Sequence, residues 1–333
     1  MYTDEDLNLA IKKGVFTTAS VDEFRHLMSS SSGTSSVDEE NFRLVGGFND
    51  IFVVIACALL LFSSLWVLQS VNDSLGYFVF AALSWGLSEV FILRRKMALP
   101  AIVLLLAFVG GVFAFTQSLF GWQSSYAVIV ATALSTVTAY VHWRRFNVPI
   151  TVAVGVGAAL AMLASVVISI VPDRTDILMV TLFVCGCIAF VCAMYWDAAD
   201  TNRTTRKSDV AFWLHLLSAP LIIHPIFSSL GVLDGNESLN NMTMIVLLYV
   251  FMTVISVAID RRAFMVSSLF YVIYALSSLF ENYGGVGYSL AATGVVMGAF
   301  LLMLSVYWQT VRALFVLQLP EEIQRYLPAI RAK

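Results

Sequence analysis

The stretch LGYFVFAALSWGLSEVFILRRKMALPAIVLLLAFVGGVFAFT (residues 75–116) contains two long apolar runs separated by the basic group Arg94-Arg95-Lys96. Each run is close to the ~20 residues that an α-helix needs to cross about 30 Å of hydrocarbon. Neither run alternates apolar and polar residues as a half-buried strand would. The stretch therefore predicts two transmembrane helices that reverse direction at a basic loop.

The same pattern of apolar run and polar gap repeats along the chain. We expect spans at 48–68, 75–93, 98–116, 125–142, 148–171, 177–196, 211–232, 242–259, 264–280 and 286–308. The composition agrees, because only 12% of residues are charged, whereas a soluble domain carries about 25%. The sequence predicts an all-α, polytopic membrane protein with about ten transmembrane helices.

Basic residues are segregated to one side of this series of spans. Every Lys and Arg except Arg174 lies in the N-terminal region, in alternate loops or in the tail. These are Lys12, Lys13, Arg25, Arg43, Arg94, Arg95, Lys96, Arg144, Arg145, Arg203, Arg206, Lys207, Arg261, Arg262, Arg312, Arg325, Arg331 and Lys333. Because basic loops stay in the cytoplasm during insertion, the pattern predicts cytoplasmic N- and C-termini.

Three parts follow from this organisation. Residues 1–47 are expected to form a cytosolic arm, with capped short helices over 4–13 and 20–28 and a flexible Ser-rich linker at 29–36. Two such helices cannot bury a core alone, so the arm is expected to dock on a protein partner or on the membrane. Residues 48–308 form the transmembrane domain.

Residues 309–333 are expected to form an amphipathic cytoplasmic tail. Pro320 before Glu321 and Glu322 predicts the start of a short helix, and Pro328 predicts its end. We expect this tail to lie on the lipid surface. No basic face interleaved with aromatic residues suggests a nucleic-acid partner.

The segment around the seventh span is the densest in polar groups. His215, Ser218 and His224 lie within an apolar stretch, and Pro220 removes a backbone hydrogen bond, which predicts a kink. Together with a buried Glu89 they are the candidate intramembrane polar site, suited to a proton relay or an ion. The alternative is structural hydrogen bonding, since a straight helix places the two histidines on opposite faces.

Glu89 is the other functional candidate, because an unpaired carboxylate is costly within hydrocarbon. A structural ion pair with nearby cations is the alternative to a cation-coupled role. Asn49, Asp50 and Asp209 lie at a similar depth and are candidates for one cytoplasmic-side network with Glu89. By contrast, Asp197 and Asp200, in the longest basic loop, are expected to be surface charges.

Several other sequence features are expected to have structural roles and no catalytic or ligand-binding role. The four cysteines lie in apolar segments, so we expect no disulfide and no metal site. The chain has no His-Glu-x-x-His or Gly-x-Ser-x-Gly motif, so we expect neither an enzyme nor a cofactor. Six tryptophans are expected at the membrane interfaces, among them Trp308. Small residues at Gly294-x-x-x-Gly298 and at Gly157, Ala161 and Ser165 predict close helix contacts.

Four segments carry a resemblance to a known group. They are the arm, EENFRLVGGFNDIFV (39–53), TRKSDVAFWLHLLSAPLIIHP (205–225) and WQTVRALFVLQLPEEIQRYLP (308–328). The chain resembles uncharacterised multi-pass inner-membrane proteins of Gram-negative bacteria related to domain of unknown function 2157. That resemblance implies a bacterial inner-membrane location and supplies no activity and no site residues.

Two functions remain open at this point. The spans, the proline-interrupted helix and Glu89 favour a transporter-like protein for a small molecule or ion, with two five-helix halves (48–171 and 177–308) in an inverted repeat. The small number of intramembrane charges and the tethered arm favour a non-transporting scaffold or sensor that binds a partner. A wet cavity lined by the candidate polar groups would support transport, and separate bonding of each group would count against it.

Overall fold

The structure is a computed structural model that describes residues 7, 10–31, 48–122, 124–172, 174–201, 203, 205–231, 238–282 and 288–329. Of the expected helix over 4–13, residues 7 and 10–13 are described, and 10–12 are helical. Most of the Ser-rich linker and the Gly-rich approach to the last span lie outside the described residues. The chain divides into two compact units, Met1–Asn41 and Phe42–Lys333, whose residues contact mainly their own unit. Each is described by itself.

The first unit contains α2 (Thr18–Ser31), which begins earlier and ends later than the 20–28 expected. A reciprocal cap explains its start. The Ser20 Oγ accepts from the Thr17 N–H at 3.0 Å, and the Thr17 Oγ1 accepts from the Ser20 N–H at 3.1 Å. Thr17 is therefore the N-cap, and Ser20 lies three residues after it, inside the first turn of the helix.

The second unit confirms the all-helical membrane fold. In the described part of the chain, ten helices are long and apolar enough to span a membrane. They are α3 (Phe48–Gln69), α4 (Asp73–Ser88) continued by the π-helix η1 (Glu89–Arg94), α5 (Ala98–Phe120), α6 (Ser125–Phe146), α7 (Ile150–Ile170), α8 (Thr175–Ala198), α9 (Arg206–Ser228), α10 (Leu239–Ile259), α11 (Ala263–Asn282) and α12 (Ser289–Val316).

The largest differences from the expected bounds fall on two helices. Helix α9 begins five residues before the expected 211, because Thr205 caps it. Helix α12 continues eight residues beyond the expected 308, since its first helix breaker is Pro320. At 28 residues it is about 42 Å long, which exceeds the hydrocarbon thickness of about 30 Å.

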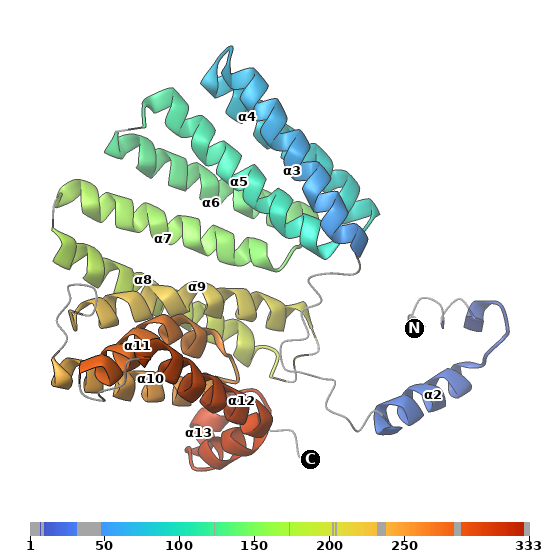
Figure 1. Cartoon of the computed structure of the whole chain (residues 1–333). Coiled ribbons are helices and arrows are strands. Elements are labelled where there is room, and N and C mark those ends of the chain that lie inside the picture. The colour runs from blue at the N-terminus through green and yellow to red at the C-terminus, as the bar shows by residue number, and fades with distance from the viewer. Residues whose placement is uncertain are drawn as a thin grey trace. The chain divides into compact units, whose positions relative to one another are not determined.

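Helices of the second unit are stacked largely in chain order, as the colour sequence in Figure 1 shows. Helices α3 to α7 pack on their sequence neighbours, and α7 then packs on both α8 and α9. Helix α9 also packs on α11, which in turn packs on α10 and α12. The two five-helix groups therefore meet through α7, α8 and α9. Whether they form an inverted repeat stays a prediction.

Helices α8 and α9 approach each other closely at a glycine that the sequence analysis did not select. A Cβ added at Gly186 would lie 2.7 Å from Ile222 Cγ1 and 2.9 Å from the Ile222 backbone nitrogen. Only a glycine fits such backbone contact without displacing α9. Gly294 and Gly298, expected to be contact points, have no atom within 4 Å of such a Cβ. That expectation was wrong, because the Gly294–Gly298 face of α12 packs against none of the described helices.

Four interhelical turns lie at one end of the second unit, which we call the basic end. They follow η1, α6, α8 and α10, and each contains one non-glycine residue with positive φ: Lys96, Asn147, Arg203 and Asp260 respectively. Asn and Asp tolerate this left-handed conformation, whereas Lys and Arg adopt it at a cost of roughly 1–2 kcal/mol. Such a residue persists when surrounding contacts hold it in place, and Arg203 has those contacts.

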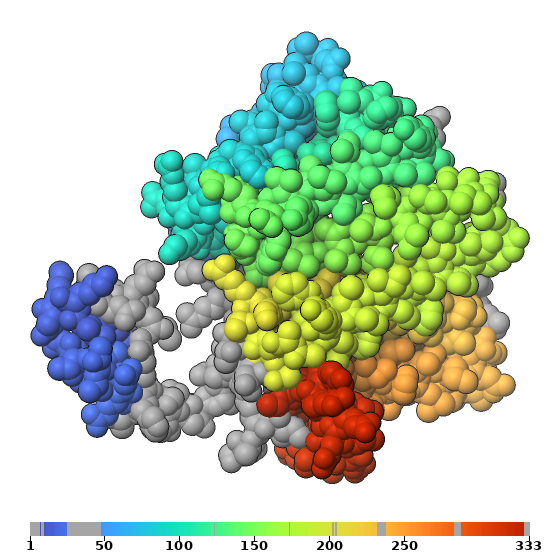
Figure 2. Space-filling model, turned by 180° about the vertical axis from the view of Figure 1, so that it is seen from behind, coloured from blue at the N-terminus to red at the C-terminus, as the bar shows by residue number. Residues whose placement is uncertain are grey.

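The tail returns to the basic end after α12. Its short helix α13 (Glu321–Gln324) begins directly after Pro320, as expected, and ends before Pro328 is reached. Leu327 is buried in the apolar core formed with α9, α10 and α11. Figure 2 shows the red C-terminal segment packed against the yellow part of the chain. The tail is therefore part of the folded unit, and its expected position on the lipid surface stays a prediction.

Candidate functional site

The turn between α10 and α11 supplies the centre of a buried ion-pair network. Asp260 caps α10 in the left-handed conformation, with φ of 58°, and the next N–H, that of Arg261, returns to the Ser256 carbonyl at 2.9 Å. This tight turn sends consecutive side chains in different directions. Asp260 and Arg261 point into the protein and are 5% and 2% exposed, while the Arg262 guanidinium lies over the Trp308 ring.

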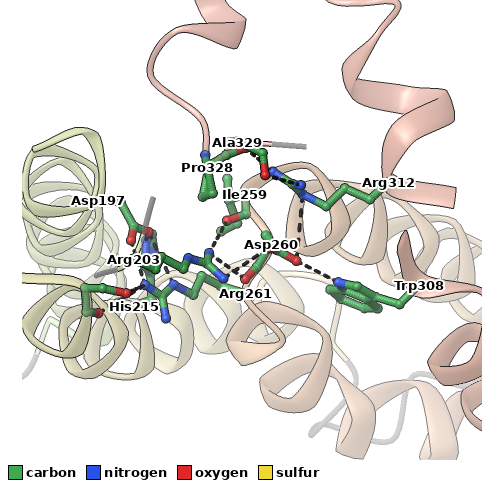
Figure 3. Close-up of polar contacts among 11 residues, drawn as sticks. Asp197, Arg203, His215, Ile259, Asp260, Arg261, Trp308, Arg312, Pro328 and Ala329 are labelled. Atoms are coloured by element: carbon green, nitrogen blue, oxygen red, sulfur yellow. Dashed lines mark hydrogen bonds and ion pairs between the residues drawn. The ribbon is translucent and has the colours of Figure 1, made fainter. Parts of the chain in front are cut away.

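Arg261 holds one half of the network together. Its Nη2 donates to Asp197 Oδ1 at 2.6 Å and to both oxygens of Ser208 at 3.1 Å. The other carboxylate oxygen of Asp197 is 3.0 Å from His215 Nε2. Asp197 closes α8 and His215 lies within α9, so these contacts tie α8, α9 and the α10–α11 turn together (Figure 3).

Asp260 organises the other half. Its Oδ2 accepts from Arg203 Nη1 at 3.0 Å, and its Oδ1 accepts from Trp308 Nε1 at 2.8 Å. Arg312 Nε is 3.7 Å from the same Oδ1. Arg203 also donates to the carbonyl of Asp260 at 3.0 Å. These bonds explain why Arg203 keeps a left-handed backbone, because its side chain is anchored on the neighbouring turn.

The tail completes this half through its backbone. Arg312 donates to the carbonyl oxygens of Pro328 and of Ala329, the second at 3.3 Å. The Ala329 N–H donates to the Thr201 carbonyl at 3.2 Å. Figure 3 shows the tail carbonyls directed at the Arg312 guanidinium. The C-terminal segment is therefore held by the same network that joins the helices.

The ion pairs of this network join three arginines, Arg203, Arg261 and Arg312, to two aspartates, Asp197 and Asp260. Burial, and then the nearby Arg261 charge, lower the pKa of Arg203 from its ordinary value. Taking charges out of water is costly unless partners and hydrogen bonds compensate. The tail carbonyls supply part of that compensation at Arg312, where a third carboxylate would otherwise be expected.

Asp200, in the loop between α8 and α9, organises the start of α9. Asp200 Oδ2 accepts from the Thr205 N–H at 2.8 Å and from the Thr205 hydroxyl at 2.7 Å. Thr205 in turn caps α9 by accepting from the Lys207 N–H at 3.3 Å. Asp200 therefore fixes the N-terminus of the helix that carries His215.

The expected surface position of Asp197 and Asp200 was wrong, since they are 1% and 8% exposed. Trp308, expected at a membrane interface, is 2% exposed and bonded to Asp260. Arg261 and Arg312 were interpreted only as topological anchors, yet both are almost fully buried. The adjacent opposite charges Asp260-Arg261 in a two-helix turn were the one sequence feature that could have suggested a network.

The candidate intramembrane groups are bonded to separate partners. The Glu89 carboxylate accepts hydrogen bonds from Nε and Nη2 of Arg145 on α6, at 2.9 and 2.8 Å. His215 is held by Asp197, and His224 Nδ1 is 2.7 Å from the Tyr271 hydroxyl on α11. Thus Glu89 forms a helix-to-helix ion pair, in the π-helical turn η1, and the two histidines belong to different contacts.

The remaining candidates have structural surroundings. The Ser218 hydroxyl donates to the backbone carbonyl of His215 at 3.1 Å, and not to the imidazole. Helix α9 is continuous through Pro220, which faces outward. In the expected cytoplasmic-side network, Asn49 is exposed, Asp50 is buried and Asp209 is half-buried. No hydrogen bond among the described residues joins these three to Glu89.

A third histidine, which the sequence analysis did not select, lies in the first group of helices. His142 on α6 is fully buried, and its Nδ1 is 3.3 Å from the Thr151 hydroxyl of α7. The rings of Trp85, Phe108 and Phe146 surround it, with centroids 4.5–6.1 Å from that of the imidazole. These surroundings make His142 a packing and hydrogen-bonding group between α6 and α7.

Models of known protein families, curated proteins and solved structures yield no match to this chain. The resemblance to proteins related to domain of unknown function 2157 therefore stays a prediction.

Proposed function

We propose that this protein is an integral membrane scaffold or sensor that works through its basic end, and that it is neither a transporter nor an enzyme. The observation that carries the proposal is the seating of the tail: backbone carbonyls at Pro328 and Ala329 bind the buried Arg312. A chain terminus held by a charge network can be released when a partner competes for the same arginine. The arm at 1–47 would be a second docking element.

The separate bonding of Glu89, His215 and His224 argues against the transporter-like alternative. A transported proton or ion needs groups that change partners within reach of water. Glu89 is instead neutralised by Arg145 through two hydrogen bonds, which suits a structural role. His215 has its Nε2 committed to a carboxylate that also binds Arg261.

The proposal includes a location. With cytoplasmic termini and a bacterial inner membrane, as the basic loops and the resemblance imply, the basic end faces the cytosol. The arm and the tail would then be accessible to cytosolic proteins.

Replacing Arg312 tests the seating of the tail. In Arg312→Gln we expect residues 321–327 and Ala329 to exchange backbone amide protons roughly tenfold faster or more, since each hydrogen bond to a charged group contributes about 1.5–3 kcal/mol. Arg325→Gln is the matched control, because Arg325 is exposed and bonds only the adjacent Tyr326 hydroxyl among the contacts described. Equal exchange in both variants would show that Arg312 does not hold the tail.

A second experiment compares protein partners and transport. Crosslinking in membranes is expected to give different partner sets for the wild type, for Arg312→Gln and for a variant lacking residues 1–36. A deletion strain complemented with Glu89→Gln, His215→Ala or His224→Ala is then screened for metabolite and ion sensitivity. Unchanged partner sets together with a transport defect in these three variants would reject the scaffold in favour of the transporter.

A further inference from the structure

Two apolar grooves flank α12 on the outside of the second unit. One lies between α11 and α12, with a volume of about 190 Å³, and the other lies between α10 and α12, with about 430 Å³. Both are open on one side. Leu304 lies between them and lines both.

The walls of the α11–α12 groove are those of a hydrocarbon site. From α11 it is lined by Met265, Val266 and Leu269, and from α12 by Leu301 and Leu304. Val266 is 57% exposed, so the groove opens outward within two membrane spans. Water gains no hydrogen bonds from such walls, whereas a lipid chain loses nothing by entering. The shape and the apolar walls of this groove therefore suit an acyl chain.

A cation stands at the basic end of the same groove. Arg262, which begins the α11 side of the lining, has its guanidinium 5.1 Å from the centroid of the Trp308 ring. The Trp308 ring is itself fixed by the 2.8 Å hydrogen bond to Asp260. Arg262 directly precedes α11 and so stands at one end of a candidate span, and its planar donors suit phosphate oxygens.

We propose that the α11–α12 groove binds one anionic phospholipid of the leaflet at the basic end. Its acyl chain lies along Leu269 and Leu301, and its phosphate group binds Arg262. The α10–α12 groove is the internal contrast, because no charged residue lines it. That groove takes an acyl chain without selecting the headgroup. The lipid site is independent of the proposed scaffold function, and either can fail alone.

Lipid titration of the detergent-purified full chain, followed by native mass spectrometry, tests the site. The probes are phosphatidylglycerol and phosphatidylcholine with identical acyl chains. We expect the wild type to hold one phosphatidylglycerol in preference to phosphatidylcholine. In Arg262→Gln the phosphatidylglycerol affinity is expected to fall about fivefold, the effect of one cation near an anionic surface, and the preference to disappear.

Two further variants complete the test. Arg144→Gln is the matched control, since Arg144 is also a basic-end arginine beside an aromatic ring, that of Tyr140, and lines neither groove. It is expected to keep the preference. Ser305→Phe places a ring at the rim of the α11–α12 groove and is expected to weaken both lipids equally. An unchanged preference in Arg262→Gln, or an equal loss in Arg144→Gln, would overturn the proposal. If Arg262→Gln does not fold, undiminished lipid binding by Ser305→Phe would overturn the proposal.

Discussion

Among the described carboxylates of α8 and α9, Asp197 has the most bonds within the buried ion-pair network. Both carboxylate oxygens accept from Arg261, and Oδ2 is also bonded to His215. All three groups are at most 2% exposed. Removing one member of a buried ion pair is more destabilising than the pair itself is stabilising, because the partner charge is left without compensation. At residue scale, stability therefore depends on retaining both signs of charge.

The variant Asp197→Asn measures this dependence. We expect it to lower the free energy of unfolding by about 3–5 kcal/mol, because Arg261 stays buried without its carboxylate. Thermal unfolding of the purified protein in detergent is the measurement. Asp176→Asn is the control: that carboxylate also binds an arginine, Arg174, but on the exposed surface, so no measurable change is expected. Similar melting temperatures for both variants would contradict a stabilising role for the buried pair.

At the scale of elements, the α8–α9 pair connects the two groups of helices. Its close approach depends on Gly186, where the backbone of α9 is reached, and its basic end is tied by Asp197 and His215. Packing and charge thus fix the same two helices at different depths. Helix α12 is different, because its outward face carries Gly294 and Gly298 and two open apolar grooves lie beside it.

Adding one methyl group tests that packing. Gly186→Ala is expected to destabilise the protein by about 1–3 kcal/mol, because the new Cβ would overlap the backbone of Leu221 and Ile222. The matched control is Gly294→Ala, where no atom lies within 4 Å of the new Cβ. The unfolding temperatures of the two variants are compared in the same detergent. If Gly186→Ala is as stable as Gly294→Ala, the two helices are less closely packed than described.

At the scale of the whole molecule, charge distribution and helix direction agree. The turns after η1, α6, α8 and α10 collect at the basic end together with the end of α12. Arg174, the one basic residue in the other set of loops, is paired locally with Asp176, and that hydrogen-bonded pair raises the pKa of Arg174. Arg174, the exception to the segregation of basic residues, therefore has an acidic residue beside it.

Single cysteines in a background without native cysteines report the orientation. We expect Lys96→Cys to react with a membrane-impermeant maleimide only after the cells are opened, because its turn belongs to the basic end. Asn72→Cys, in the turn between α3 and α4, is expected to react in intact cells. The reverse pattern of labelling would show that the basic end faces outward.

The amino-acid sequence alone determined the class of protein and the ten spans, because hydrophobicity adds up along a helix and needs no knowledge of its neighbours. It also selected Glu89 and His215 as polar groups that need partners. Their partners, Arg145 and Asp197, are 56 and 18 residues away along the chain, and hydropathy contains no information about such pairs.

Only the tertiary structure decided which charges are buried. Asp260, Arg261 and Arg262 are adjacent in the sequence, yet the left-handed turn at Asp260 sends two of them into the network and the third to the groove beside Trp308. Side-chain direction in a short turn depends on backbone dihedrals and on the helices packed around it. The sequence therefore placed the charges at the correct end of the protein, and the fold determined their roles there.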